Sequence, residues 1–90
     1  MSRHVYRYEV PADDQAHSFE GIIGTPVAVA NVGLKKVEFW AEQADTVDAK
    51  RSFRVYGTGQ WLPPGARYCG TAPRNEAGLV WHLVELTDDV

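Results

Sequence analysis

The sequence predicts an all-β domain, and three features of the chain lead to this prediction. No window of useful length places apolar residues at the i, i+3, i+4 and i+7 positions of an amphipathic helix. Runs with strand-like alternation recur instead, at spacings of about ten residues, and glycine or proline residues separate them. About six to seven short strands of this kind can close as a small antiparallel barrel or as a two-layer sandwich, and the sequence leaves both open.

The first half of the chain contains three predicted strands. His4–Val10 is the first, because alternate side chains fall on opposite faces of an extended segment. Pro11 ends it, so we expect a tight connection and a hairpin partner next in the chain. That partner is a weaker strand beginning at His17, which Gly24-Thr25-Pro26 terminates. Val27–Val32 is apolar on both faces, a pattern typical of a central strand.

The second half begins with a turn at Gly33, where glycine can take a positive φ. Lys36–Gln43 then alternates between an apolar face and a mostly charged face, and Trp40 is an exception on the charged face. A short acidic loop follows. The remaining predicted strands are Lys50–Tyr56, Arg67–Thr71 and Leu79–Leu86.

Length and composition restrict the classes of protein further. Ninety residues are enough for one domain, which we expect to span residues 1–90. The net charge of −3 disfavours a polyanion-binding surface, and 44% hydrophobic residues exclude a disordered chain. A single cysteine excludes an intramolecular disulfide, and no stretch approaches the roughly 18 uncharged residues of a membrane span. We therefore expect a soluble cytoplasmic protein.

Several short motifs occur along the chain in a specific order. They are YRYEVP (residues 6–11) followed by Asp13-Asp14, FRVYGTG (residues 53–59), Leu62-Pro63, YCGTA (residues 68–72), and VWHL (residues 80–83) with Glu85. In this combination the chain resembles a family of small uncharacterised proteins from actinobacteria and their bacteriophages. The resemblance implies no activity. It implies a genomic setting in which many such reading frames are accessory proteins made inside the host, some of which bind host proteins.

The candidate catalytic and metal-binding residues form no recognisable site. His4, His17, His82 and Cys69 lack the short spacings of metal ligands, so we expect neither a metal nor a cofactor. Cys69 and His82 could act as nucleophile and base if their strands were neighbours, but no oxyanion-hole motif accompanies them. Gly57-Thr58-Gly59 leads into a proline-rich loop and not into a helix, so it is predicted to be a turn. We expect a protein that is not an enzyme.

Aromatic residues beside an arginine suggest a second class of function. Small β-barrels bind single-stranded nucleic acid by stacking bases on aromatic rings near basic groups. Tyr6 and Tyr8 share one face of their strand, and Arg54 and Tyr56 share a face of theirs. Arg7 points away from the tyrosines beside it, and the net charge opposes this interpretation. Single-stranded nucleic-acid binding is therefore the alternative hypothesis.

The apolar residues favour a protein-binding module. Both faces of Leu79–Leu86 are apolar, and only one face of a strand can contact the core of so small a domain. Either a second chain or the Gln60–Ala66 loop must cover the other face. Tryptophans in polar or loop surroundings are typical of protein interfaces. We therefore expect a homo-oligomer, such as a dimer, that also binds an unidentified host protein; a virion-associated role fits the same fold. The candidate interface residues are Trp40, Trp61, Leu62, Trp81 and His82.

Overall fold

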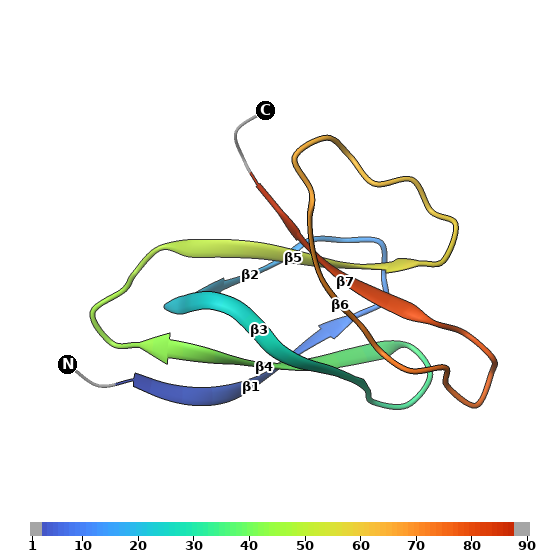
Figure 1. The fold of residues 1–90 in the computed structure, drawn as a ribbon, viewed down its shortest axis with the longest axis horizontal. Helices are drawn as coiled ribbons and strands as arrows, with labels where there is room; N and C mark the ends of the chain where they lie inside the picture. The colour runs from blue at the N-terminus through green and yellow to red at the C-terminus, as the bar shows by residue number, and fades with distance from the viewer. Residues whose placement is uncertain (1–2, 88–90) are drawn as a thin grey trace.

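The structure is a computed structural model that describes residues 3–87 and consists of two antiparallel sheets packed face to face (Figure 1). The all-β prediction is confirmed, and the closure is a sandwich. Sheet A has the strand order β1-β4-β3 and sheet B the order β2-β5-β7-β6. Within residues 3–87 no helix has the length and hydropathy needed to cross a membrane. The strands are β1 (Arg3–Pro11), β2 (His17–Glu20), β3 (Ile22–Asn31), β4 (Lys36–Ala44), β5 (Lys50–Gly57), β6 (Arg67–Thr71) and β7 (Trp81–Leu86).

The hairpin predicted between the first two strands is wrong. β1 pairs with β4 along all nine of its residues, from Arg3 opposite Ala44 to Pro11 opposite Lys36. β2 pairs with β5 in the other sheet. Between β1 and β2 the chain bends, with Asp14 at a φ of +62°, and crosses from sheet A to sheet B. The predicted turn is present, but it joins two layers instead of two neighbouring strands.

The boundary predicted between the second and third strands is also wrong. Gly21 separates β2 from β3, because its φ of +83° turns the chain from sheet B back to sheet A within one residue. Gly24-Thr25-Pro26 lies inside β3, where the register with β4 shifts between Ile23 and Ala28. Such an irregularity accommodates a proline on an edge strand.

β3 is an edge strand and not the predicted central strand. Val29 packs against the core, whereas Val27 on β3 is 66% exposed. The valine and alanine side chains of β3 make both of its faces apolar in sequence, but they are small enough for one face to remain in solvent. An apolar pattern alone therefore did not predict burial.

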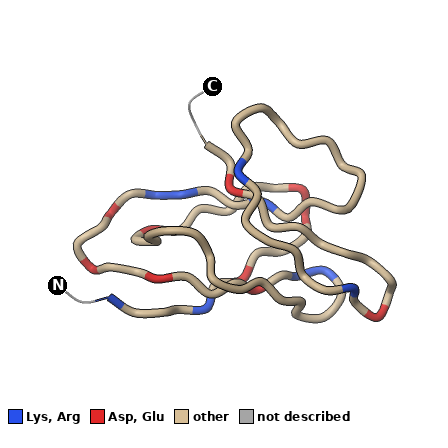
Figure 2. The backbone as a smooth tube through the Cα atoms, in the orientation of Figure 1, with Lys and Arg blue, Asp and Glu red and all other residues tan. Residues whose placement is uncertain are grey.

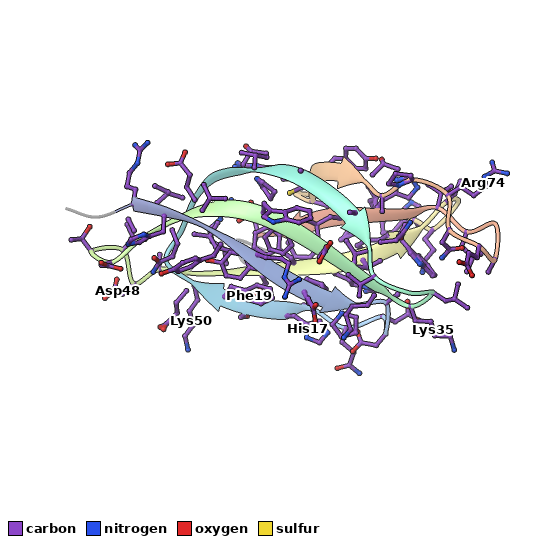
Figure 3. The ribbon with its side chains drawn as sticks, turned by 90° about the horizontal axis from the view of Figure 1, so that it is seen from below. His17, Phe19, Lys35, Asp48, Lys50 and Arg74 are labelled. Atoms are coloured by element: carbon purple, nitrogen blue, oxygen red, sulfur yellow. The ribbon has the colours of Figure 1, made fainter. Side chains whose placement is uncertain are left out.

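An aromatic cluster joins the two sheets at the centre of the core. It contains one ring from each of β1, β4, β2 and β5, namely Tyr8, Phe39, Phe19 and Phe53, and Figure 3 labels Phe19. Neighbouring ring centroids lie 5.0–6.1 Å apart, a spacing at which aromatic pairs attract. Phe39 and Phe53 are fully buried. These contacts fix which face of each strand points inward.

A buried ion pair ties sheet B to the irregular part of β3. Arg51 Nε and Nη2 donate to the carboxylate oxygens of Glu85 at 2.7 and 2.9 Å, in a bidentate arrangement. Arg51 Nη1 also donates to the carbonyl oxygens of Ile22 and Gly24, at 3.2 and 2.9 Å. The guanidinium therefore provides hydrogen-bond partners for two carbonyl groups near the start of β3.

Candidate functional site

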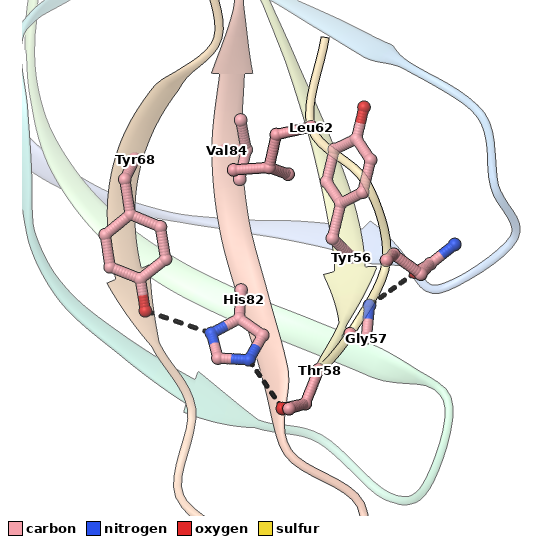
Figure 4. A pocket seen from close by; sticks show the side chains of 9 residues that line it. Tyr56, Gly57, Thr58, Leu62, Tyr68, His82 and Val84 are labelled. Atoms are coloured by element: carbon pink, nitrogen blue, oxygen red, sulfur yellow. Dashed lines mark hydrogen bonds between the residues drawn. The ribbon is translucent and has the colours of Figure 1, made fainter.

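A hollow of about 240 Å³ opens on the face of sheet B that points away from sheet A (Figure 4). Its floor comes from β5 and β7. Val55 and Leu83 are buried against sheet A, so strand alternation turns Tyr56, His82 and Val84 to the opposite face. The aromatic ring of Tyr68 on β6 forms one wall, and the loop after β5 forms the other.

His82 holds the polar end of this hollow in place. Its Nε2 lies 2.8 Å from Thr58 Oγ1, and its Nδ1 lies 3.0 Å from the Tyr68 hydroxyl and 3.2 Å from Thr71 Oγ1. Each ring nitrogen therefore has at least one hydroxyl partner, and because a hydroxyl can donate or accept, one nitrogen can donate while the other accepts. With both ring nitrogens bonded, the imidazole orients its neighbours.

The loop between β5 and β6 covers part of the same face. Leu62 reaches over the floor of the hollow (Figure 4). In that floor Val84 is fully buried, and Tyr56 is only 3% exposed. Thr87 Oγ1 anchors the far end of the loop by donating to the Gly65 carbonyl at 3.0 Å. The second apolar face of β7 is therefore partly covered by the chain's own loop, one of the two possibilities that the sequence left open.

The rim of the hollow is uncharged and rich in exposed aromatic surface. Residues 57–66 contain no charged side chain, and the loop appears as an unbroken tan segment between coloured positions in Figure 2. Trp61, between two residues that line the hollow, is 79% exposed, and Tyr68 is 53% exposed. Exposed tryptophan side chains beside apolar hollows are frequent in the surfaces by which proteins bind one another.

Comparison with known proteins places the whole chain in one family. The family model of DUF7352, a domain of unknown function, matches residues 1–90. The chain belongs to the DUF7352 family. No curated protein and no solved structure matches it.

The fold of this DUF7352 chain separates the predicted interface residues. Leu62 and His82 meet in the hollow, and Trp61 lies at its rim. Trp81 instead packs against the core, and its Nε1–H donates to the Leu34 carbonyl oxygen at 3.0 Å. Trp40 lies half-buried on the outer face of sheet A, in a strand position opposite Arg7. That face carries the ion pairs Arg3–Glu42, Arg7–Glu38 and Lys36–Glu9.

The four residues suggested for nucleic-acid binding are not brought together. Tyr6 and Tyr8 point toward the inside of the sandwich from β1. Arg54 and Tyr56 lie on the outer face of sheet B, where the guanidinium carbon is 4.5 Å from the ring centroid. Arg54 also pairs with Asp14 at 3.4 Å, and Tyr56 is almost fully buried. The rings therefore do not form one stacking platform.

Cys69 and His82 also point to different faces of sheet B. Cys69 packs against the core, and its Sγ donates weakly to the Arg67 carbonyl oxygen at 3.5 Å. Burial raises the pKa of the Cys69 thiol above its ordinary value. A half-buried thiol with a raised pKa is a poor nucleophile, and His82, on the other face of the sheet, cannot act as its base. Across residues 3–87 no three His, Cys, Asp or Glu side chains lie close enough together to hold a metal ion.

The sequence did not single out Tyr68, Thr58 or Thr71 as partners of His82. Tyr68 and Thr71 are three positions apart, so a regular strand would place them on opposite faces. The register of β6 against β7 shifts between Tyr68 and Gly70, and the extra residue puts both on the outer face. No pattern in the sequence marks that bulge.

Proposed function

We propose that this protein is a non-catalytic protein-binding module, and that it binds its partner through the hollow around His82. The partner inserts an uncharged apolar side chain between Leu62 and Tyr68, and Trp61 packs against the partner's surface beside it. The observation that carries this proposal is the 79% exposure of Trp61 at the rim of an apolar, hydrogen-bonded hollow.

The chemistry of the rim supports an apolar partner segment. The loop brings no charge to the contact, so binding costs no desolvation of charged groups. A hydrogen bond joins Tyr68 to the imidazole of His82 and holds both side chains in place, so little side-chain entropy is lost when a partner docks. Their tilted rings, with centroids 5.8 Å apart, offer a rigid aromatic wall.

The arrangement of the titratable groups favours binding over catalysis. A general base needs a free ring nitrogen within reach of a substrate, whereas both nitrogens of His82 are occupied by side-chain hydroxyls. The thiol of Cys69 faces the core. The cellular setting that we propose is the cytoplasm of an actinobacterial host, with the protein acting as a phage or host accessory protein.

Affinity capture with matched variants tests this proposal. Tagged wild-type protein, Trp61→Ala and Trp40→Glu are used to capture partners from an actinobacterial lysate, with and without nuclease. Trp40 is the control because it lies on the opposite sheet, among ion pairs. We expect a nuclease-resistant partner protein that Trp61→Ala loses and Trp40→Glu retains, with Kd weakened by a factor of about 30 or more for Trp61→Ala.

Other outcomes would overturn the assignment in distinct ways. Capture that is equal for all three proteins would show that the hollow is not the binding surface. Loss of every partner on nuclease treatment would favour the nucleic-acid alternative. Recovery of the tagged protein alone from the lysate, together with its presence in purified phage particles, would favour a virion role.

A further inference from the structure

The outer edge of β1 offers a second binding surface, separate from the hollow. β1 is nine residues long, and its ladder with β4 contains no register shift. Among residues 3–87 no other strand pairs with its free edge. Residues 3–7 are all exposed, including Val5 at 60% and Tyr6 at 46%. A long, regular edge of this kind presents unpaired N–H and C=O groups to a further strand.

The other three sheet edges carry features that oppose strand addition. β3 is interrupted by its register shift and contains Pro26. β2 has four residues, and β6 has five with a bulge near its middle. Short edge strands, bulges and prolines are the usual protection against edge-to-edge pairing. β1 has its one proline at the last position, Pro11, and no bulge, so its remaining protection is the charge of Arg3, Arg7 and Glu9, which a partner strand must complement.

We infer that two copies of the chain associate through β1, antiparallel and about a two-fold axis at Tyr6, into a continuous six-stranded sheet. A two-fold axis perpendicular to the sheet gives both copies the same inward face. Opposed residues of antiparallel strands point to the same face, so an inward-facing residue must lie opposite an inward-facing one, and the axis must pass through a residue and not between two residues. Centring on Tyr6 pairs residues 3–9 of one copy with residues 9–3 of the other. The inward-facing rings of Tyr6 then meet at the axis.

The charged residues of β1 favour the register centred on Tyr6 over the registers centred on nearby residues. Centring on Tyr6 places Arg3 opposite the partner's Glu9, twice by symmetry. Centring on Val5 would place Arg3 opposite the partner's Arg7, and centring on Arg7 would place two arginines in contact. A register centred on Tyr8 would draw Pro11, which has no N–H, into the ladder.

In the proposed dimer, the ion pairs on the outer face of sheet A would continue across the contact between the two β1 strands. Arg3 Nε lies 3.0 Å from Glu42 Oε1, and Lys36 Nζ lies 3.3 Å from Glu9 Oε1. In the dimer, Glu42, Arg3, the partner's Glu9 and the partner's Lys36 would follow one another with alternating sign. Such networks contribute more than isolated surface pairs. The dimer also covers part of the exposed surface of Val5 and Tyr6.

Charge reversal and sedimentation equilibrium test this interface on the full chain. We expect wild type to be a concentration-dependent dimer, and Arg3→Glu or Glu9→Arg each to weaken dimerisation about tenfold or more. The double variant restores opposite charges across the seam but leaves the repulsions with Glu42 and Lys36 within each chain. Recovery of dimerisation by the double variant is therefore specific to the proposed pairing.

A thiol at position 6 provides an independent measurement. Opposed residues of antiparallel strands have Cα atoms about 4.5 or 5.5 Å apart, within the range of a disulfide. In a Cys69→Ala background we expect Tyr6→Cys to form a covalent dimer on mild oxidation and Val5→Cys, which faces the partner's Arg7, to do so far more slowly. A monomer at every concentration would overturn the inference, as would equal cross-linking at positions 5 and 6. Binding of an extended foreign peptide by a monomeric protein would also overturn it.

Discussion

Gly70 and Val29 bring the two sheets together at one edge of the sandwich. Gly70 is on β6 and Val29 on β3, and a Cβ atom built on Gly70 would lie 2.7 Å from Val29 Cγ2. Such a distance is far below van der Waals contact, so only glycine fits this position. Beside it the Asn31 side-chain amide donates to the Pro73 carbonyl oxygen. Close packing of β3 on β6 therefore depends on the missing side chain.

Gly70→Ala is expected to lower the free energy of unfolding by about 1–3 kcal/mol, because the added methyl group overpacks this edge. Urea unfolding monitored by tryptophan fluorescence measures the effect. Gly57→Ala is the matched control, since its Cβ would lie 3.4 Å from Trp81 Cζ3, an ordinary contact. Adding Val29→Ala to Gly70→Ala should remove part of the loss; independent, additive effects would contradict the proposed clash.

Glu85→Gln is expected to cost about 3–5 kcal/mol, because it leaves the guanidinium of Arg51 largely buried without a counter-charge. Urea unfolding again measures the change. The double variant Arg51→Met, Glu85→Leu should recover much of this stability, since neither charge remains to be desolvated. A single variant as stable as wild type would show that the pair contributes little.

Acid should destabilise the protein through the same pair. Hydrogen bonds from Arg51 hold the pKa of Glu85 below its ordinary value of 4.5, so the unfolded chain binds a proton more readily than the folded one. The contribution of the Arg51–Glu85 pair to the free energy of unfolding is therefore complete above pH 4.5. It is lost as the pH falls through the lowered pKa of Glu85 in the folded state. Unfolding free energies measured at stepwise lower pH should fall less steeply for Glu85→Gln. A hydrogen bond with His17 also lowers the pKa of Asp13, so Asp13 contributes to the loss of stability in acid in the same direction. The Asp13→Asn variant separates its contribution from that of Glu85.

Tyr8→Phe is expected to maintain the free energy of unfolding or raise it by about 1 kcal/mol. The Tyr8 hydroxyl is buried, and no group in residues 3–87 hydrogen bonds to it. Burial also raises the pKa of this hydroxyl. Tyr68→Phe is the comparison, since it removes a hydroxyl bonded to His82 and should lower stability by about 0.5–1.5 kcal/mol. Thermal unfolding of both variants decides the sign, and a greater loss for Tyr8→Phe would contradict the structure.

The thiol of Cys69 should react slowly with iodoacetamide in the folded protein. Its raised pKa keeps it protonated at neutral pH, and it packs against the core. Alkylation followed by mass spectrometry over a pH series is expected to give a midpoint above that of the urea-unfolded chain. His82→Gln should leave the rate unchanged, because the imidazole lies on the other face of sheet B. Fast alkylation that slows in the His82→Gln variant would contradict this prediction and would support Cys69 and His82 as a nucleophile and its base.

Much of the fold follows from local pattern. Alternation over Lys36–Gln43 and Lys50–Tyr56 predicted β4 and β5 to within one residue, because the side chains of a half-buried strand must alternate whatever it pairs with. The turn at Gly33 was predicted for a similar reason, since the φ of +66° there is a local requirement. Candidate site residues such as Leu62 and His82 were recognisable as apolar or polar residues in unusual surroundings.

The sequence by itself determined that this chain is an all-β domain and which residues form most of its strands, because those properties depend on neighbours a few positions apart. Only the tertiary structure decided that β1 pairs with β4, that Trp81 enters the core, and that Tyr68 meets His82. Strand pairing between distant segments is chosen by the summed burial and hydrogen bonding of the whole sandwich. A one-residue bulge in β6 changes which face a side chain occupies, and no local pattern contains that choice.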